Sequence, residues 1–411
     1  MTTGDRLPGV AVFDADAPPA VAFTRSLGAR GVPVTVYSPH RTSAAGASRF
    51  AAATARCPPP DQPERFLVWL EAEFRAGRIG CVAPTSDNIA FCLAELHDLL
   101  PPALQRVLPA PAAARNALFK DRFHGVLQTL SFPAPRTAAP RTPDEAEQLA
   151  TTLRFPVVIK PRAHVGAMLD RGTVVRDQRA LRRHFTACHD GSPMVLARYP
   201  SLRLPMLQEY VPGALQNLYS VSGLLGCSGE VLAVAGARKT AQWPPTLGVG
   251  TRFEPWLDAA AMARGAELAR AVLGTGIFEL EFIWDAERQA LLAIDLNPRG
   301  FGQISLDVAR GNDLPWEWYR LYRGDTLSPR AAPRPDVHWR HALPFHVDHV
   351  ARVVRGPHRV REAAAYLTTW REPAVDIVLD TRDVLPAVVY TARMLRHPGG
   401  LVRPFLRAPA A

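Results

Sequence analysis

Residues 276–299 read GIFELEFIWDAERQALLAIDLNPR, and this stretch decides the fold. Two apolar runs flank a polar centre, a pattern that predicts a β-hairpin. Side chains alternate along each strand, so one face of the hairpin is predicted to be apolar and to pack against the core. The residues predicted on that face are Phe278, Leu280, Phe282, Trp284, Leu292, Ile294 and Leu296.

The opposite face of this hairpin carries three acids and an amide. A register centred on Arg288 places Glu281 opposite Asp295. The same register places Glu279 opposite Asn297. Like charges that face each other across strands destabilise a sheet, so something must compensate. Carboxylate and amide oxygens are ligands of Mg²⁺, usually together with nucleotide phosphates, and the pattern favours a metal site over a polar surface paired with arginine.

The composition indicates a folded, cytoplasmic protein. The chain has 411 residues, a length that predicts two or three domains, and 47% of its residues are hydrophobic against 21% charged. It contains neither a run of about 18 uncharged apolar residues nor an N-terminal stretch of the secretory type. Five scattered cysteines without a CxxC pair indicate reduced thiols rather than a zinc site or a disulfide framework.

The net charge of +10 is dispersed along the chain. There is no cluster of basic residues, zinc-finger spacing or RNA-recognition signature, so no nucleic acid partner is expected. An excess of arginine in residues 331–411 leaves two interpretations open, a solvated surface and a contact with a polyanion or a membrane surface.

Lysine is scarce in this chain. Only three of the 48 Lys and Arg residues are lysines, and they are Lys120, Lys160 and Lys239. Lysine offers a compact point charge with three rotatable donors, which suits a phosphate oxygen in a tight site better than a guanidinium does. The count alone is equally compatible with chance, so the surrounding motifs must decide whether these lysines bind phosphate.

Residues 8–110 are predicted to form a small α/β unit. Strands that alternate with helices favour a parallel sheet covered on both faces. No GxGxxG motif follows the first strand, so dinucleotide binding has no support. The predicted strands are 9–13, 32–37 and 79–83, and the predicted helices are 18–30, 63–75 and 88–100. Strand-like runs then dominate residues 155–296, and a Pro/Arg linker from residue 328 opens a segment of amphipathic helices.

Three further motifs carry chemistry. Residues 155–161 (FPVVIKP) form a strand that delivers Lys160 at its end. Residues 207–213 (LQEYVPG) end a strand at a Pro-Gly turn, and a helix that starts near Asn116 carries Lys120. Each motif alone is ordinary, because a lysine can emerge from an edge strand or lie on a solvated helix face.

Taken in order, these motifs resemble the ATP-grasp superfamily over about residues 105–325. The likeness is to the branch of carboxylate–amine ligases and carbamoyl phosphate synthases, in which Ser48-Arg49-Phe50 and Pro84-Thr85-Ser86-Asp87 also have counterparts. The resemblance implies a fold of class α/β and α+β. Its implied parts are a Rossmann-like pre-ATP-grasp domain (1–108), a two-lobed ATP-grasp domain with ATP between the lobes and a hinge near 208–213 (109–327), and a basic, partly helical C-terminal extension (328–411).

The resemblance also implies roles for individual residues. Lys120 and Lys160 would hold the α- and β-phosphates of ATP, and Lys239 would lie near the γ-phosphate. Arg299 would steady the transferring phosphoryl group or the substrate carboxylate. The implied ligands of Mg²⁺, or alternatively Mn²⁺, are Glu281, Asp295 and Asn297. The implied adenine hinge is Gln208, Glu209, Tyr210 and Val211, with Gln216 at the ribose.

The sequence departs from the family pattern in three places. Asp295 stands where the longer Glu is usual, and Gln216 lies in a stretch that is often acidic. The loop at 162–166 (RAHVG) lacks the usual glycines. His164 in this loop is expected to be structural rather than a contact to phosphate or substrate.

The predicted function is an ATP-dependent, ADP-forming ligase that activates a carboxylate as an acyl phosphate and couples it to an amine. One alternative is a non-catalytic or regulatory ATP-binding protein, and another is a basic nucleic-acid or membrane-surface protein. Retention of the proposed metal ligands favours the enzyme. Candidate substrate contacts are Ser86, Asp87 and Arg252. The expected partners are small-molecule carboxylates and amines, whose identity the sequence leaves open together with the oligomeric state.

Overall fold

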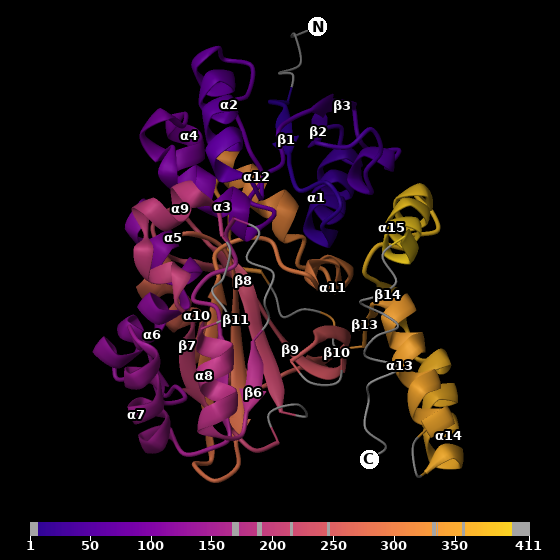
Figure 1. The fold of residues 1–411 in the computed structure, drawn as a ribbon. Coiled ribbons are helices and arrows are strands. Elements are labelled where there is room, and N and C mark those ends of the chain that lie inside the picture. The colour runs from indigo at the N-terminus through magenta and orange to yellow at the C-terminus, as the bar shows by residue number, and fades with distance from the viewer. Residues whose placement is uncertain are drawn as a thin grey trace, which may run out of the picture.

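The computed structural model describes residues 7–166, 172–186, 191–213, 217–244, 247–330, 334, 336–355 and 358–396. This part of the chain is a mixed α/β structure with sheets of three, four and seven strands. In Figure 1 the three-stranded sheet lies at the top and the seven-stranded sheet runs through the middle. Three helices lie along the right side, and they are α13 (Ala342–Arg355), α14 (Arg359–Thr368) and α15 (Leu385–Arg396).

The three-stranded sheet is parallel, as predicted, and it differs from the prediction in one strand. Its strands are β1 (Val10–Val12), β2 (Val34–Ser38) and β3 (Ala53–Arg56). The predicted strand at 79–83 is reduced to a single bridge between Val82 and Ala11. β3 has mostly exposed side chains and therefore no apolar run to predict it. The helices of this segment are α1 (Pro18–Gly28), α2 (Pro63–Arg75) and α3 (Asp87–Glu95).

The four-stranded sheet presents Lys160 and Gln208 on neighbouring strands. Its order is β4 (Thr137–Ala138), β7 (Met206–Glu209), β5 (Val157–Lys160) and β6 (Thr173–Val175), and all of its pairs are antiparallel. Two helices share an apolar core with it, α7 (Pro143–Leu153) and α8 (Gln178–Thr186). That core is built from alternate residues of β5, which leaves Lys160 at the end of the strand free to point elsewhere.

The seven-stranded sheet is the largest element of the fold. Its order is β12 (Ala290–Asn297), β11 (Gly276–Asp285), β8 (Leu218–Leu225), β9 (Val231–Trp243), β10 (Val249–Trp256), β13 (His338–Arg340) and β14 (Ala374–Asp376). Helix α10 (Ala259–Leu273) packs on one face through Ala266, Ala269 and Leu273. The last two strands come from the segment after residue 327, which was expected to be partly helical and for which no strand was predicted.

The predicted hairpin register is confirmed at its polar end. Glu281 pairs with Asp295, and Glu279 pairs with Asn297. Beyond Glu281 the register shifts by one residue, so that Phe282 pairs with Ala293 instead of Ile294. A bulge of this kind reverses which face the following residues occupy. The prediction that Ile294 joins Phe278 in this core is therefore wrong, and Ala293 packs there together with Leu296, as predicted for the latter. Leu292 is buried but lies on the other face, where it pairs with Ile283.

The remaining elements connect these sheets. The helices are α4 (Pro102–Gln105), α5 (Pro111–Leu118), α6 (Lys120–Thr129), α9 (Pro193–Arg198), α11 (Ile304–Ala309) and α12 (Leu314–Arg323). Short 3₁₀ helices occur at η1 (Ala45–Ala47), η2 (His97–Leu99), η3 (Pro200–Arg203) and η5 (Thr369–Arg371). Within the ranges given above, no helix is both long enough and apolar enough to cross a membrane.

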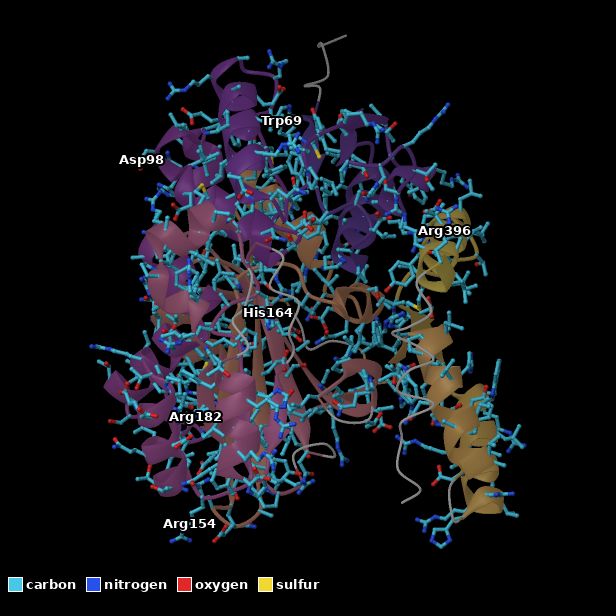
Figure 2. The ribbon with its side chains drawn as sticks, in the orientation of Figure 1. Trp69, Asp98, Arg154, His164, Arg182 and Arg396 are labelled. Carbon is cyan, nitrogen blue, oxygen red and sulfur yellow. The ribbon has the colours of Figure 1, made fainter. Side chains whose placement is uncertain are left out.

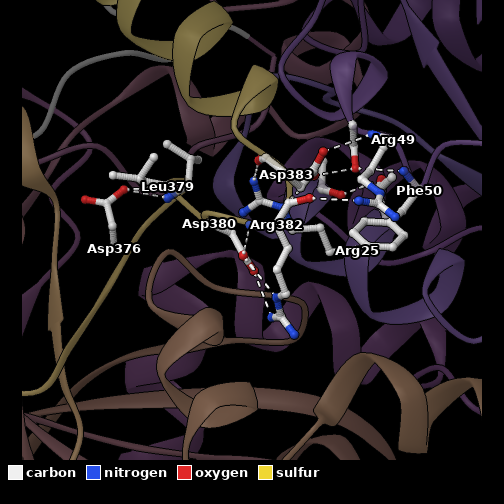
Figure 3. A network of polar contacts seen from close by, with 12 residues as sticks. Arg25, Arg49, Phe50, Asp376, Leu379, Asp380, Arg382 and Asp383 are labelled. Carbon is white, nitrogen blue, oxygen red and sulfur yellow. Dashed lines mark hydrogen bonds and ion pairs between the residues drawn. The ribbon is translucent and has the colours of Figure 1, made fainter.

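Asp383 ties the segment before α15 to the N-terminal sheet unit (Figure 3). Its carboxylate accepts hydrogen bonds from Arg25 Nε at 2.9 Å, Ser48 Oγ at 2.7 Å and the backbone N–H of Arg49 at 2.9 Å. Arg25 also donates to the backbone carbonyl of Asp383 at 2.6 Å. Because Asp383 is buried and fully bonded, it fixes where α15 starts. We refer to Asp383, Arg25, Ser48 and Arg49 as the Asp383 clamp.

Trp318 joins α12 to α1 and to the chain at Val107, so its substitution tests how much these contacts stabilise the fold. It is fully buried, packs edge-on against Phe23 of α1 at 5.8 Å between ring centroids, and donates to the carbonyl of Val107 at 3.2 Å. Trp318→Ala is expected to lower the free energy of unfolding by about 3–5 kcal/mol, because it leaves a large cavity. Trp370, which is 59% exposed, is the control, and Trp370→Ala should cost less than about 1 kcal/mol in the same urea titration.

Candidate active site

A cavity of about 970 Å³ lies on the face of the large sheet opposite α10. One half of it, the polar half, is lined by Ser220, Lys239, Glu279, Glu281, Asp295, Asn297, Arg299 and Gln303, with His164 beside them. The other half, the apolar half, is lined by Trp243, Val249, Thr251, Phe253, Trp339, His341, Pro344, Ile377, Tyr390 and Met394. In Figure 2 His164 lies near the middle of the view, whereas Asp98 and Arg396 lie toward its sides.

The buried Lys120 neutralises one of the two facing carboxylates. Lys120 begins α6, and its Nζ donates to Asp295 Oδ2 in a close ion pair. Burial raises the pKa of Asp295, but Lys120 and Lys160 outweigh it and lower the pKa to about 2. The repulsion that sequence predicts between Glu281 and Asp295 is therefore offset at Asp295. Among the described residues, none forms a hydrogen bond or ion pair with Glu281.

Lys160 is held at the end of β5 by a chain of polar groups. Its Nζ donates to Gln208 Oε1 at 3.0 Å, and Gln208 Nε2 lies 2.9 Å from His124 Nε2 and 3.0 Å from Thr137 Oγ1. Burial, and then the nearby Lys120, lower the pKa of Lys160 to about 8. Burial and the charge of Lys160 lower the pKa of His124 to about 3, so this imidazole is neutral at pH 7.

Lys239 and Glu279 complete the charged lining on β9 and β11. Burial lowers the pKa of Lys239, while Glu281 and Glu279 act in the opposite direction. Burial, and then Glu281, raise the pKa of Glu279 to about 8. Glu279 accepts hydrogen bonds from Asn297 Nδ2 at 3.1 Å and from Gln303 Nε2. The carboxyl of Glu279 is thus held in place by amides rather than by a cation.

Arg299 is bound to Asp87, so the structure brings these two predicted residues together. Arg299 Nε and Nη2 donate to the two carboxylate oxygens of Asp87 at 2.9 and 3.0 Å. Nη2 also donates to Asn297 Oδ1 at 2.9 Å. Ser86 caps α3 and donates to Asp14, whose pKa burial raises to about 6. The carboxyl end of β1 and the start of α3 therefore lie against the end of β12.

The other predicted residues lie in different surroundings. The Glu209 side chain is engaged by Arg136 at 2.8 Å and Arg288 at 2.9 Å. Tyr210 and Val211 directly follow β7. Arg252 does not line the cavity, because its guanidinium pairs with Glu254 and Glu372, both at 2.6 Å. Gln216 lies outside the described residues.

Sequence analysis missed several residues of the cavity wall. Gln303 and Ser220 carry no motif, although Ser220 pairs with Glu281 across β8 and β11. His164 was expected to be structural, yet it lines the cavity and helps to lower the pKa of both Asp87 and Asp295. A lone serine, glutamine or histidine gives no pattern. The pairing of β8 with β11 could have identified Ser220, whereas Gln303 and His164 lie outside the strands.

The lining fits a divalent ion that arrives with a nucleotide. No group of three or more His, Cys, Asp or Glu side chains suited to a metal occurs in the described ranges. Mg²⁺ does not need one, since it is usually held by one or two carboxylates together with substrate phosphates and water. Glu281, with no cation bound to it, and Asp295 opposite it supply those two carboxylates.

The comparisons with known proteins agree with this geometry. No family model matches the chain. The C-terminal section of a carbamoyl phosphate synthase large chain from Methanopyrus kandleri is 24% identical over 192 residues. That match covers 44% of this chain and 32% of the relative, so the chain corresponds to about a third of that protein.

Two solved structures share the fold. N5-carboxyaminoimidazole synthetase from Staphylococcus aureus has a TM-score of 0.62, 12% identity and 84% coverage of each chain. The biotin carboxylase domain of 2-oxoglutarate carboxylase from Hydrogenobacter thermophilus, in complex with MgADP, ADP and bicarbonate, has a TM-score of 0.60 and 15% identity, and the match covers 80% of this chain and 73% of that one. The predicted resemblance to the ATP-grasp superfamily is confirmed, and the chain has the ATP-grasp fold.

The two facing carboxylates are expected to respond differently to neutralisation. Asp295→Asn should lower the free energy of unfolding at pH 7 by about 1–3 kcal/mol, because the buried Lys120 loses its ionic partner. Glu281→Gln should cost less, because the charge lost near Lys239 is offset by the charge removed beside Glu279. Urea titrations without Mg²⁺ measure both, and equal losses would contradict the pairing of Lys120 with Asp295.

Proposed function

We propose that this chain, with its ATP-grasp fold, is an ATP-dependent ligase that activates a carboxylate as an acyl phosphate and couples it to an amine. ADP and phosphate would be released. One observation carries the proposal: all three lysines of the chain lie within electrostatic reach of the Glu281–Asp295 pair. A chain that otherwise uses arginine has its three lysines at one site. Compact positive charges of this kind suit a triphosphate and its metal.

The proposed chemistry has two steps. A carboxylate oxygen bonds to the γ-phosphorus while the bond to ADP breaks. The amine nitrogen then bonds to the acyl carbon, phosphate leaves and the amine loses a proton. In the first step Lys120 and Lys160 would hold the α- and β-phosphates, and Lys239 would neutralise charge near the γ-phosphate. Catalysis of this kind is mostly positioning and charge stabilisation, so no protein nucleophile is needed.

Glu281 and Asp295, with the Asn297 amide beside them, would hold Mg²⁺ or alternatively Mn²⁺, which would supply positive charge at the transferring group. Arg299 is fixed by Asp87 and Asn297, so it offers an oriented guanidinium to the phosphoryl group or the substrate carboxylate. We propose that Ser86 and Asp87 support the substrate side of the site. Arg252 has its charge satisfied by Glu254 and Glu372, so we do not extend the proposal to it.

The nucleotide base would lie at the end of β7. The side chain of Glu209 is held by Arg136 and Arg288, so backbone groups of residues 209–211 rather than this carboxylate would read the purine edge. Gln208 would act through Lys160, which it orients. The domain division that goes with this proposal is 1–108, 109–327 and 328–411, with the hinge near 208–213.

Glu281→Gln tests the proposed chemistry without removing a structural ion pair. Turnover should fall by about a hundredfold or more, because charge stabilisation of the transferring group is usually the largest catalytic contribution. Binding of ATP should change less, because the lysines remain. The two readouts are the amount of acyl phosphate trapped with hydroxylamine and the affinity for ADP. Glu287→Gln, in the exposed turn of the same hairpin, is the matched control and should behave as wild type.

The lowered pKa of Lys160 predicts a pH dependence of nucleotide affinity. Lys160 loses its charge progressively around pH 8, so this charge should favour nucleotide binding fully only well below pH 8. Above that pH the affinity should fall by up to about tenfold per pH unit. Lys160→Arg should bind ATP more weakly at pH 7, because a guanidinium does not fit a site for a point charge. Its charge persists to pH 9.5, so its affinity should fall less than that of the wild type, and the remaining fall would report Glu279, whose pKa is also about 8. Wild-type affinity that stays flat across this range would contradict the assignment.

A further inference from the structure

The cavity continues beyond the charged residues. It follows a row of directly paired residues that crosses the sheet from strand to strand. Leu218 on β8 pairs with Lys239 on β9, and Lys239 pairs with Phe253 on β10. Phe253 in turn pairs with Trp339 on β13, and their rings meet edge-on at 5.3 Å. Directly paired residues point to the same face of a sheet, and all four line the cavity. A continuous surface therefore leads from the proposed phosphate site to the C-terminal strands.

The far wall of the cavity belongs to the segment after residue 337. β13 supplies Trp339, and His341 follows it directly. Ile377 follows β14, and α15 supplies Tyr390 and Met394. No Asp, Glu, Lys or Arg side chain lines this apolar half among the described residues. Burial lowers the pKa of His341 to about 4, so its imidazole is uncharged at pH 7.

The apolar half differs from a simple core in its unpaired polar atoms. Trp243 Nε1, Thr251 Oγ1 and His341 Nδ1 are buried and have no hydrogen-bond partner in the described part of the chain. Native cores leave very few such atoms unpaired, and these three border the cavity, where polar groups of a bound molecule would reach them. Within the described ranges, the imidazole has one side-chain hydrogen bond, which joins His341 Nε2 and the Tyr390 hydroxyl at 3.3 Å.

Two anchors hold α15 in place as this wall. The Asp383 clamp fixes the chain just before the helix (Figure 3). Near the other end, Arg393 pairs with Asp16 at 2.5 Å and donates to the carbonyl of Thr42 at 2.6 Å. Both anchors attach to the N-terminal sheet unit, so Tyr390 and Met394 are presented to the cavity by a fixed helix.

We propose that the apolar half binds the uncharged part of one substrate, and that this substrate is a carboxylate or amine with a bulky apolar group such as an aromatic α-amino acid. The inference rests on the proposed function and names its substrate class. The charged head of the substrate would lie toward Arg299 and Lys239, and its apolar group would pack between Phe253, Trp339 and Tyr390. Aromatic side chains on several walls favour a flat, apolar partner.

Direct binding tests this inference separately from turnover. Phenylalanine, leucine, alanine and glycine are titrated calorimetrically into the full chain in the presence of Mg²⁺ and ADP. Phenylalanine is expected to bind at least tenfold more tightly than alanine, with leucine between them. Equal affinity for phenylalanine and alanine, or no binding of phenylalanine, would overturn the inference.

Variants of the wall locate the binding. Tyr390→Ala and Met394→Ala should each weaken phenylalanine binding by about tenfold while the affinity for ADP is unchanged. Leu385→Ala is the control, because Leu385 is 59% exposed at the start of the same helix and lines no part of the cavity. Unchanged phenylalanine affinity in both wall variants would overturn the inference.

Asp383 acts through α15, so it is a positioning residue. Asp383→Asn should weaken phenylalanine binding in the same direction as the wall variants and leave ADP affinity unchanged, which a general loss of folding would not do. ADP release with the same amino acids is measured in parallel. Tight phenylalanine binding without ADP release, both alone and together with a second amino acid as the other substrate, would leave this inference standing and contradict ligase activity on amino acids.

Discussion

Two carboxylates that face each other on neighbouring strands inside a protein must have positive charge close to them, and this constraint organises the whole site. Glu281 and Asp295 meet it through lysines delivered by three different elements, the start of α6, the end of β5 and the middle of β9. The four-stranded sheet and the large sheet must approach each other for this to happen. The position of these two sheets and the charge of the site are therefore linked.

The side chains that line the cavity change in character from one strand of the large sheet to the next. Its β12 and β11 edge carries acids, its centre carries Lys239, and its β10 and β13 edge carries aromatic rings. The acids and Lys239 lie in different rows of paired residues, so the site is built from residues far apart in sequence. This is also why the chain has the fold of solved structures at only 12–15% identity: the sheet fixes geometry while individual rows change.

The sequence predicted strand pairing best where a short turn joins two strands that each show a clear pattern. The facing of Glu281 and Asp295 followed from period-2 alternation in a hairpin, and it is confirmed. The bulge after Glu281 was not predictable, because Ile294 and Ala293 are both compatible with a core position. β13 and β14 are three residues long and pair with strands or segments distant in sequence, so neither periodicity nor propensity reveals them. The ion pair of Lys120 with Asp295 likewise joins residues 175 positions apart.

The Asp383 clamp has a consequence for how the protein folds. Asp383 and Arg25 are separated by 358 residues, so their contact closes a very long loop, and such contacts form slowly. The N-terminal sheet unit and the centre of the large sheet depend on much shorter separations. We therefore expect the compartment behind Trp339 to be the last region to assemble and the first to open locally, while the lysine-lined half is already in place.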